Sequence, residues 1–259
     1  MSRVNDSTKK LKKLWQGFSE NEKIVTLYLA YTSPPASIDI LSSILKTTAV
    51  ATLNLLEQLR KKRIVHESKE YGKGFYVLSD MSLRDFVATT VSLPQARQVL
   101  KDILKICASA IPEGPDRTLI LGELYWHLGD TGDGLEYIKK AADLLYKCGE
   151  KGKAASYYSY ALKIFAEYGL AGTKPGEFLN SILIEFVRAG HLLPPDEQIH
   201  LFTKAQEVAR QNKEWRTLTK ITLAMGQLFR EGNQLDKALL YFNDAWKLAE
   251  ATDDLDTLR

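Results

Sequence analysis

The sequence predicts a mainly α-helical protein in two parts, a small mixed domain followed by a longer array of helices. First, three short apolar patterns of helical period are followed by two short β-type runs, all between residues 19 and 80. Second, from residue 81 onward, helical patterns of similar length alternate with Gly- and Pro-containing breaks. We therefore divide the chain into a polar helical lead-in (1–18), the small domain (19–80) and the array (81–259).

The small domain is expected to open with a helix over about residues 20–31, because Ser19 followed by Glu22 forms a capping-box pattern. Residues 1–10 before it are polar and expected to fray. The breakers Ser33 to Pro35 end this helix, and two further apolar patterns follow, at Ile38, Ile40, Leu41, Ile44 and Leu45, then at Leu53, Leu55, Leu56 and Leu59. Runs at 64–66 and 75–78, with Gly72 and Gly74 between them, predict a β-hairpin. Three helices and a hairpin in this order are typical of a winged helix.

The array is expected to consist of antiparallel helical hairpins that bury their apolar faces against their neighbours. The expected breaks fall at 93–94, 111–115, 129–132, 149–152, 169–176, 190–195, near 212 and at 232–233. The last hairpin matches the tetratricopeptide offsets at Met225, Gly226, Phe229, Gly232, Asn233, Ala238, Phe242 and Ala245. Weaker matches leave Ala141, Ala161, Ala205 and Ala245 at uneven steps of 20, 44 and 40 residues. We therefore expect an irregular tetratricopeptide-like α-superhelix.

Several stretches carry a resemblance to a known group of proteins: residues 75–80 with 83–87, then 93–97, then 123–127. With the order of the two parts, they resemble the region carboxy-terminal to the nucleotide-binding module in signal-transduction ATPases with numerous domains. That group includes the maltose-regulon activators and the ATPase-linked adenylate cyclases. The resemblance implies a bacterial-type regulatory segment of a signalling or transcription-control protein. It also implies that this chain is a fragment lacking an upstream ATPase module.

The sequence contains no pattern of residues that indicates catalysis, a cofactor or a metal. Gly149 to Ala154 comes nearest to a phosphate-binding loop, but its glycine spacing is too short and it lacks the final hydroxyl. The four histidines lie in separate elements without ligand spacing, and Cys107 and Cys148 are expected to be packing residues. No apolar run reaches membrane-helix length and no signal-peptide core is present, which predicts a cytoplasmic protein with no membrane partner. We therefore expect a non-catalytic protein.

By its tetratricopeptide resemblance, the first helix of each hairpin would line a groove that binds a protein or peptide partner, or an inducer. The residues expected there are Asp116, Leu119, Glu123, Trp126 and His127 in the first hairpin, and Lys220, Leu223, Gln227, Arg230 and Glu231 in the last. An exposed Trp126 would make an interface anchor, since aromatic side chains carry much binding energy. The alternative is that Trp126 is buried against the neighbouring hairpin or the winged helix.

DNA binding by the winged helix is the alternative function. Residues 1–100 carry 15 Lys and Arg against 9 Asp and Glu, a net charge of +6, while the remainder carries 20 against 23, a net charge of −3. The residues that would contact DNA are Lys46, Thr47, Thr48, Arg60, Lys61, Lys62 and Arg63. The third helix has no Arg, Gln or Asn in its first turn and a half, where base edges are read. We therefore favour a winged helix used for packing.

Overall fold

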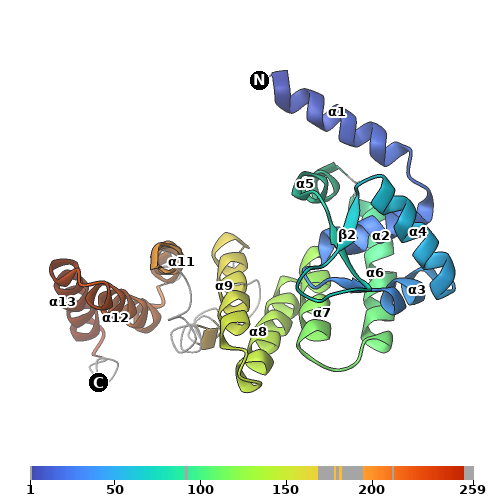
Figure 1. Cartoon of the computed structure of the whole chain (residues 1–259). Helices are drawn as coiled ribbons and strands as arrows, with labels where there is room; N and C mark the ends of the chain where they lie inside the picture. The colour runs from blue at the N-terminus through green and yellow to red at the C-terminus, as the bar shows by residue number, and fades with distance from the viewer. Residues whose placement is uncertain are drawn as a thin grey trace. The chain divides into compact units, whose positions relative to one another are not determined.

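The computed structural model describes residues 2–90, 93–168, 178, 181–182, 195–211 and 213–253. It is mainly α-helical, as predicted (Figure 1). Contacts divide the chain into two compact units, Met1–Gly134 and Leu135–Arg259, and each is described by itself. Across the described part of the chain, no single helix has both the length and the apolar composition to cross a membrane.

The first unit begins with two helices, α1 (Ser2–Gln16) and α2 (Glu20–Tyr31). Helix α1 lies within the expected helical lead-in, and the fraying of its first residues stays a prediction. The expected capping box at the start of α2 is present: the backbone N–H of Ser19 donates to Glu22 Oε2 at 2.8 Å, and the N–H of Glu22 donates to Ser19 Oγ at 3.3 Å. Because these bonds satisfy N–H groups that the helix leaves open, the start of α2 is fixed by local sequence.

Helices α3 (Ile38–Leu45) and α4 (Ala49–Lys61) follow, at the two predicted apolar patterns. Each begins at a hydroxyl cap: Ser37 accepts from the N–H of Ile40, and Thr48 accepts from the N–H of Ala51. Between them Lys46 takes a left-handed conformation with φ 51°, which ends α3. Together the two helices would match the length and composition of a membrane span, but a bend of 103° separates them.

A three-stranded antiparallel sheet completes this part of the unit, in the order β1 (Ala36–Ser37), β3 (Phe75–Leu78), β2 (Val65–Glu67). The predicted hairpin is β2 and β3, with Val65 opposite Leu78, and the two turn glycines Gly72 and Gly74 both have positive φ. Strand β1 was not predicted. It pairs with β3 through Ala36 opposite Tyr76, so the sheet has one strand more than the hairpin that we expected.

Three more helices pack into the same unit around α2: α5 (Met81–Thr90), α6 (Leu93–Ala110) and α7 (Pro115–His127). Val25 and Tyr28 of α2 lie fully buried among them. Arg84 of α5 joins α5 to the end of α2, since its Nε donates to the carbonyl of Ala30 at 2.6 Å and its Nη2 donates to the carbonyl of Thr32 at 2.7 Å. An arginine at these carbonyls satisfies acceptors that the last turn of α2 leaves open.

The second unit contains most of α8 (Thr131–Lys147) and all of α9 (Lys151–Tyr168). A polar cluster joins these two helices. The hydroxyl of the fully buried Tyr158 donates to Asp143 Oδ1 at 2.5 Å, and Lys139 Nζ lies 2.8 Å from Asp143 Oδ2. The shared carboxylate thus satisfies the buried hydroxyl and fixes how α9 lies on α8.

The unit ends with α11 (Pro195–Gln211), α12 (Trp215–Glu231) and α13 (Leu235–Ala251), which pack in sequence (Figure 1). Ala238, Ala245 and Ala249 are the buried residues of α13. Such small side chains allow close approach to the neighbouring helix. Wherever the structure describes the chain, the helix ends lie near the predicted breaks, but Leu93 and Pro94, predicted as a break, are the first residues of α6. The predicted breaks at 169–176 and near 212, and most of that at 190–195, lie outside the described residues.

Two glycines lie at close contacts between helices. A Cβ on Gly134 of α8 would lie 2.8 Å from the backbone nitrogen of Trp126 and 2.9 Å from the carbonyl oxygen of Gly122, both in α7. A Cβ on Gly226 of α12 would lie 2.5 Å from the ring of Phe242 in α13. An added Cβ at Gly134 would therefore clash with backbone atoms, whereas one at Gly226 would clash with a side chain.

The two cysteines are in different environments. Cys107 in α6 is fully buried, as expected, and burial raises the pKa of its thiol to about 12. Cys148, which directly follows α8, is exposed, so the expectation that it is a packing residue is wrong. The residue lies where the chain leaves the helix, followed by Gly149 with φ 84°, and this turn holds it at the surface.

Candidate interaction surface

The predicted binding face of α7 is closed in the structure. Leu119 and Glu123 are both 1% exposed, and the Glu123 carboxylate lies against the turn that follows α2. Its Oε2 accepts from the backbone N–H of Ser33 at 2.7 Å, and its Oε1 accepts from the hydroxyl of the same serine. Because α7 packs against α2, these two residues belong to the interior of the first unit and do not line an open groove.

The end of α7 is also packed inward. The ring centroid of His127 lies 4.6 Å from that of Tyr31, in an edge-to-face arrangement, and 4.2 Å from that of Trp126. Burial, helped by the positive charge of Arg84, lowers the pKa of His127 to about 4. Asp116, Trp126 and His127 are all partly buried. Trp126 is therefore neither the exposed anchor nor the fully buried residue of the two alternatives.

The predicted face of α12 remains accessible. Lys220, Leu223 and Gln227 are partly buried, while Arg230 and Glu231 are exposed. By helical periodicity all five share the side of α12 opposite to its buried residues, which include Leu218, Met225 and Phe229. The structure thus brings these five predicted residues together on one surface, and their role in binding stays a prediction.

The residues of the DNA-binding alternative lie at both ends of α4. At the start of this helix Lys46, Thr47 and Thr48 are exposed, but Thr48 is used as the helix cap. The first exposed side chains that follow are apolar, with Val50 69% and Leu53 38% exposed, and the first exposed polar residue of α4 is Asn54. An apolar first turn offers no donors or acceptors to base edges in a DNA groove.

Part of the basic end of α4 is neutralised by neighbouring carboxylates. Arg60 pairs with Glu57 at 3.1 Å, and Lys62 Nζ lies 2.5 Å from Glu22 Oε1. Burial of Glu22 acts to raise its pKa, but hydrogen bonds from Lys62 and Ser19 lower the pKa on balance. Among the described residues, Lys61 and Arg63 are the members of this cluster that form no ion pair. The cluster can supply a phosphate contact but little sequence readout.

Sequence reasoning missed an apolar face on α13. Leu235, Leu239, Phe242 and Trp246 follow one side of the helix, and we call these four residues the α13 stripe. Leu235, Leu239 and Trp246 are 61%, 61% and 56% exposed, and Phe242 is partly buried where its ring covers Gly226. Large apolar side chains that are exposed along one side of a helix mark interaction sites. The same periodicity also predicts a buried core face, so the sequence did not distinguish an exposed interaction face from a buried one.

An internal repeat indicates what the α13 stripe is suited to contact. A shift of 40 residues aligns the buried Ala205 and Ala209 of α11 with Ala245 and Ala249 of α13. The same shift aligns Phe202 and Gln206 with the stripe positions 242 and 246. On α11 this face is covered: Phe202 is 2% exposed, and Gln206 Nε2 donates to Thr222 Oγ1 of α12 at 3.0 Å. The α13 stripe thus repeats a face on which α11 receives the next helix.

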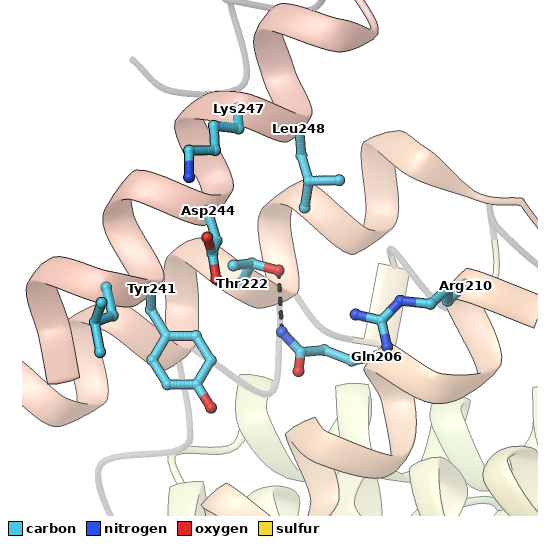
Figure 2. A pocket seen from close by; sticks show the side chains of 8 residues that line it. Gln206, Arg210, Thr222, Tyr241, Asp244, Lys247 and Leu248 are labelled. Atoms are coloured by element: carbon cyan, nitrogen blue, oxygen red, sulfur yellow. Dashed lines mark hydrogen bonds between the residues drawn. The ribbon is translucent and has the colours of Figure 1, made fainter.

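A groove of about 620 Å³ runs between α11 and α13, with α12 as its floor, and we call it the α11–α13 groove (Figure 2). Arg210 and Lys247 supply positive charges, and the polar residues are Gln206, Thr222 and Asp244. Leu240, Tyr241 and Leu248 supply the apolar part. A groove of this size with mixed lining can hold a small ligand or a few residues of a polypeptide. The predicted α12 face does not include any of these residues.

Comparisons with known proteins give limited similarity. No protein-family description matches the chain, and no curated protein matches it. The solved structure of BtubC (BKLC) from P. vanneervenii is 16% identical with a TM-score of 0.34, and the match covers 67% of this chain and 79% of that one.

A second similar structure is a signal transduction ATPase with numerous domains, with a tetratricopeptide repeat sensor, from Pyrococcus horikoshii. It is 14% identical with a TM-score of 0.36, and the match covers 96% of this chain and 48% of that one. This chain thus spans about half the length of that protein.

Proposed function

We propose that this chain is a non-catalytic interaction module whose helical array binds a partner polypeptide, as a regulatory part of a cytoplasmic signalling or transcription-control protein. The observation that carries the proposal is the α13 stripe. It exposes Leu239 and Trp246 on a face that, on α11, receives another helix. Burying such side chains is the main source of affinity at protein interfaces, and tryptophan is enriched among the residues that contribute most.

We further propose that residues 19–80 form a winged helix that serves as a packing module, and that the array is an irregular tetratricopeptide-like superhelix. Support for the winged helix comes from the order of its helices and strands, and from Val50 and Leu53 at the exposed start of α4. Support for the repeat assignment comes from the close contact of Gly226 with Phe242 and the buried Ala238 and Ala245. The same proposal includes an ATPase module that precedes this chain in a longer protein.

The proposal is tested by selecting peptides from a random display library on the immobilised chain. The affinity of each enriched peptide is then measured by fluorescence anisotropy. We expect Leu239→Glu and Trp246→Glu each to weaken binding about tenfold or more, because a charge replaces a side chain that the partner buries. Met81→Glu is the matched control, an apolar residue of the first unit that is 62% exposed, and should leave affinity unchanged. Circular dichroism of each variant verifies that the helices are retained. If no peptide is enriched, or if all three variants bind alike, the proposal is wrong.

A further inference from the structure

The α11–α13 groove carries two positive charges from opposite walls. Arg210 comes from α11 and Lys247 from α13, and both side chains are exposed. Neither forms an ion pair with any residue that the structure describes. Figure 2 shows the Arg210 side chain extending into the groove beside Gln206, with Asp244 and Lys247 on α13. With the Asp244 carboxylate, the lining has a net charge of +1, which suits an anionic group at the two cations.

The floor of the groove is polar and has a fixed hydrogen-bond arrangement. Gln206 Nε2 donates to Thr222 Oγ1 at 3.0 Å, and the Thr222 hydroxyl donates to the Leu218 carbonyl at 2.7 Å. The amide nitrogen of Gln206 is therefore engaged, which leaves its oxygen as an acceptor. The Asp244 carboxylate, which forms no ion pair among the described residues, is a second acceptor. These two side-chain acceptors can accept hydrogen bonds from the backbone N–H groups of an extended polypeptide.

The wall formed by α13 also carries the apolar side chains of the groove. Leu240 is 65% exposed, and the ring of Tyr241 is held by stacking on Phe229, with centroids 5.2 Å apart. Leu248 lies on the same side of α13, two turns after Tyr241 by helical spacing. A ligand that covers Leu240 must therefore carry an apolar group close to its anionic group.

We infer that the α11–α13 groove binds an acidic segment of the partner polypeptide, with an Asp or Glu carboxylate between Arg210 and Lys247 and a neighbouring apolar side chain on Leu240. A polypeptide is favoured over a small free anion because the groove offers side-chain acceptors for backbone N–H groups together with charged and apolar side chains. This inference rests on the proposed function and adds the chemistry of the partner. It concerns a different face of α13 from the α13 stripe.

The test uses the peptides that the chain enriches from the display library. Each acidic peptide is compared with the same peptide in which Glu is replaced by Gln, by fluorescence anisotropy at low salt. We expect the unmodified chain to bind the Glu form about tenfold more tightly, the order of a charge-assisted contact. Arg210→Gln and Lys247→Gln should each reduce that preference. Lys163→Gln, which removes an exposed positive charge on α9 outside the groove, should retain it.

The possible outcomes separate this inference from the proposed function. If peptides bind but the Glu and Gln forms bind alike, or if the groove variants keep the preference, the inference is wrong while polypeptide binding stands. If a small free carboxylate such as acetate or glutamate displaces the peptide at similar affinity, the site takes a small anion and the choice of a polypeptide is wrong. If no peptide binds at all, the proposed function itself fails.

Discussion

The carboxylate of Glu123 in α7 accepts two hydrogen bonds from Ser33, a residue 90 positions earlier in the chain. One bond comes from the backbone N–H and one from the hydroxyl, so both carboxylate oxygens hold the same turn after α2. Arg84 holds the carbonyls on the other side of this turn. The first helices of the predicted array are thus built into the same compact unit as the small domain.

Replacing Glu123 by Gln should destabilise the first unit by about 1.5–3 kcal/mol, the range for hydrogen bonds to a charged group. The loss arises because a buried amide presents a donor where the carboxylate accepted. Urea unfolding followed by circular dichroism measures the change. Glu136→Gln, at an exposed site of α8, is the control and should have little effect. Equal midpoints for the two variants would show that the contact with Ser33 adds no stability.

Acidification from pH 7 to pH 5 should weaken the first unit through His127. The pKa of this residue is about 4 in the folded protein against an ordinary value of 6.5. The unfolded chain therefore binds the proton first as pH falls, so the contribution of His127 to stability is complete above about pH 6.5 and decreases toward pH 4. His127→Gln removes the titration and should flatten this part of the pH profile. Thermal unfolding of both proteins at several pH values measures this dependence of stability on pH. If the melting temperature changes with pH equally in both proteins, the lowered pKa of His127 is contradicted.

Gly134→Ala should destabilise the contact between the first turn of α8 and α7, within the first unit, by about 1–3 kcal/mol, the usual cost of overpacking. The added Cβ meets backbone atoms of Trp126 and Gly122, which cannot move without shifting α7. Gly132→Ala is the matched control in the same helix, because its Cβ would have no atom within 4 Å. Alanine there should stabilise by about 0.5–1 kcal/mol through helix propensity. Thermal melts that rank the two variants in the opposite order would contradict the close contact.

Gly226→Ala is expected to cost less than Gly134→Ala, although its Cβ would lie closer to its neighbour. The neighbour is the ring of Phe242, a partly buried side chain of the α13 stripe that can rotate away. Tryptophan fluorescence and thermal unfolding of the two variants compare the effects. A larger loss for Gly226→Ala would mean that Phe242 is held rigidly in place.

Duplex DNA should bind this chain weakly, with an affinity that falls steeply as salt is raised. The expected contacts at Lys61 and Arg63 are to phosphates, because the start of α4 offers Val50 and Leu53 in place of groups that read bases. Fluorescence anisotropy with labelled duplex at two salt concentrations measures this, and Arg60→Ala with Lys61→Ala should weaken it further. Binding that persists at high salt and against competitor DNA would favour the DNA-binding function.

Features with a local signal could be predicted from the sequence. Ser19 and Glu22 are three residues apart, and their capping box formed as expected because both partners lie in one turn. Strand β1 was missed because Ala36 and Ser37 pair with residues some forty positions later, and two residues give no alternation pattern. The burial of Glu123 depends on the packing of α7 against α2, which sequence spacing does not report. The α13 stripe has the periodicity of a core face, and only its exposure identifies it as a surface.

The contrast between the two thiols has a practical consequence. With its pKa near 12, buried Cys107 is almost entirely protonated at neutral pH and shielded from reagents, whereas Cys148 is open to solvent. A maleimide dye added to the unaltered protein should therefore attach at a single position, directly after α8. The native chain thus carries its own labelling site, and a fluorophore placed there would follow events in the array without any engineered cysteine.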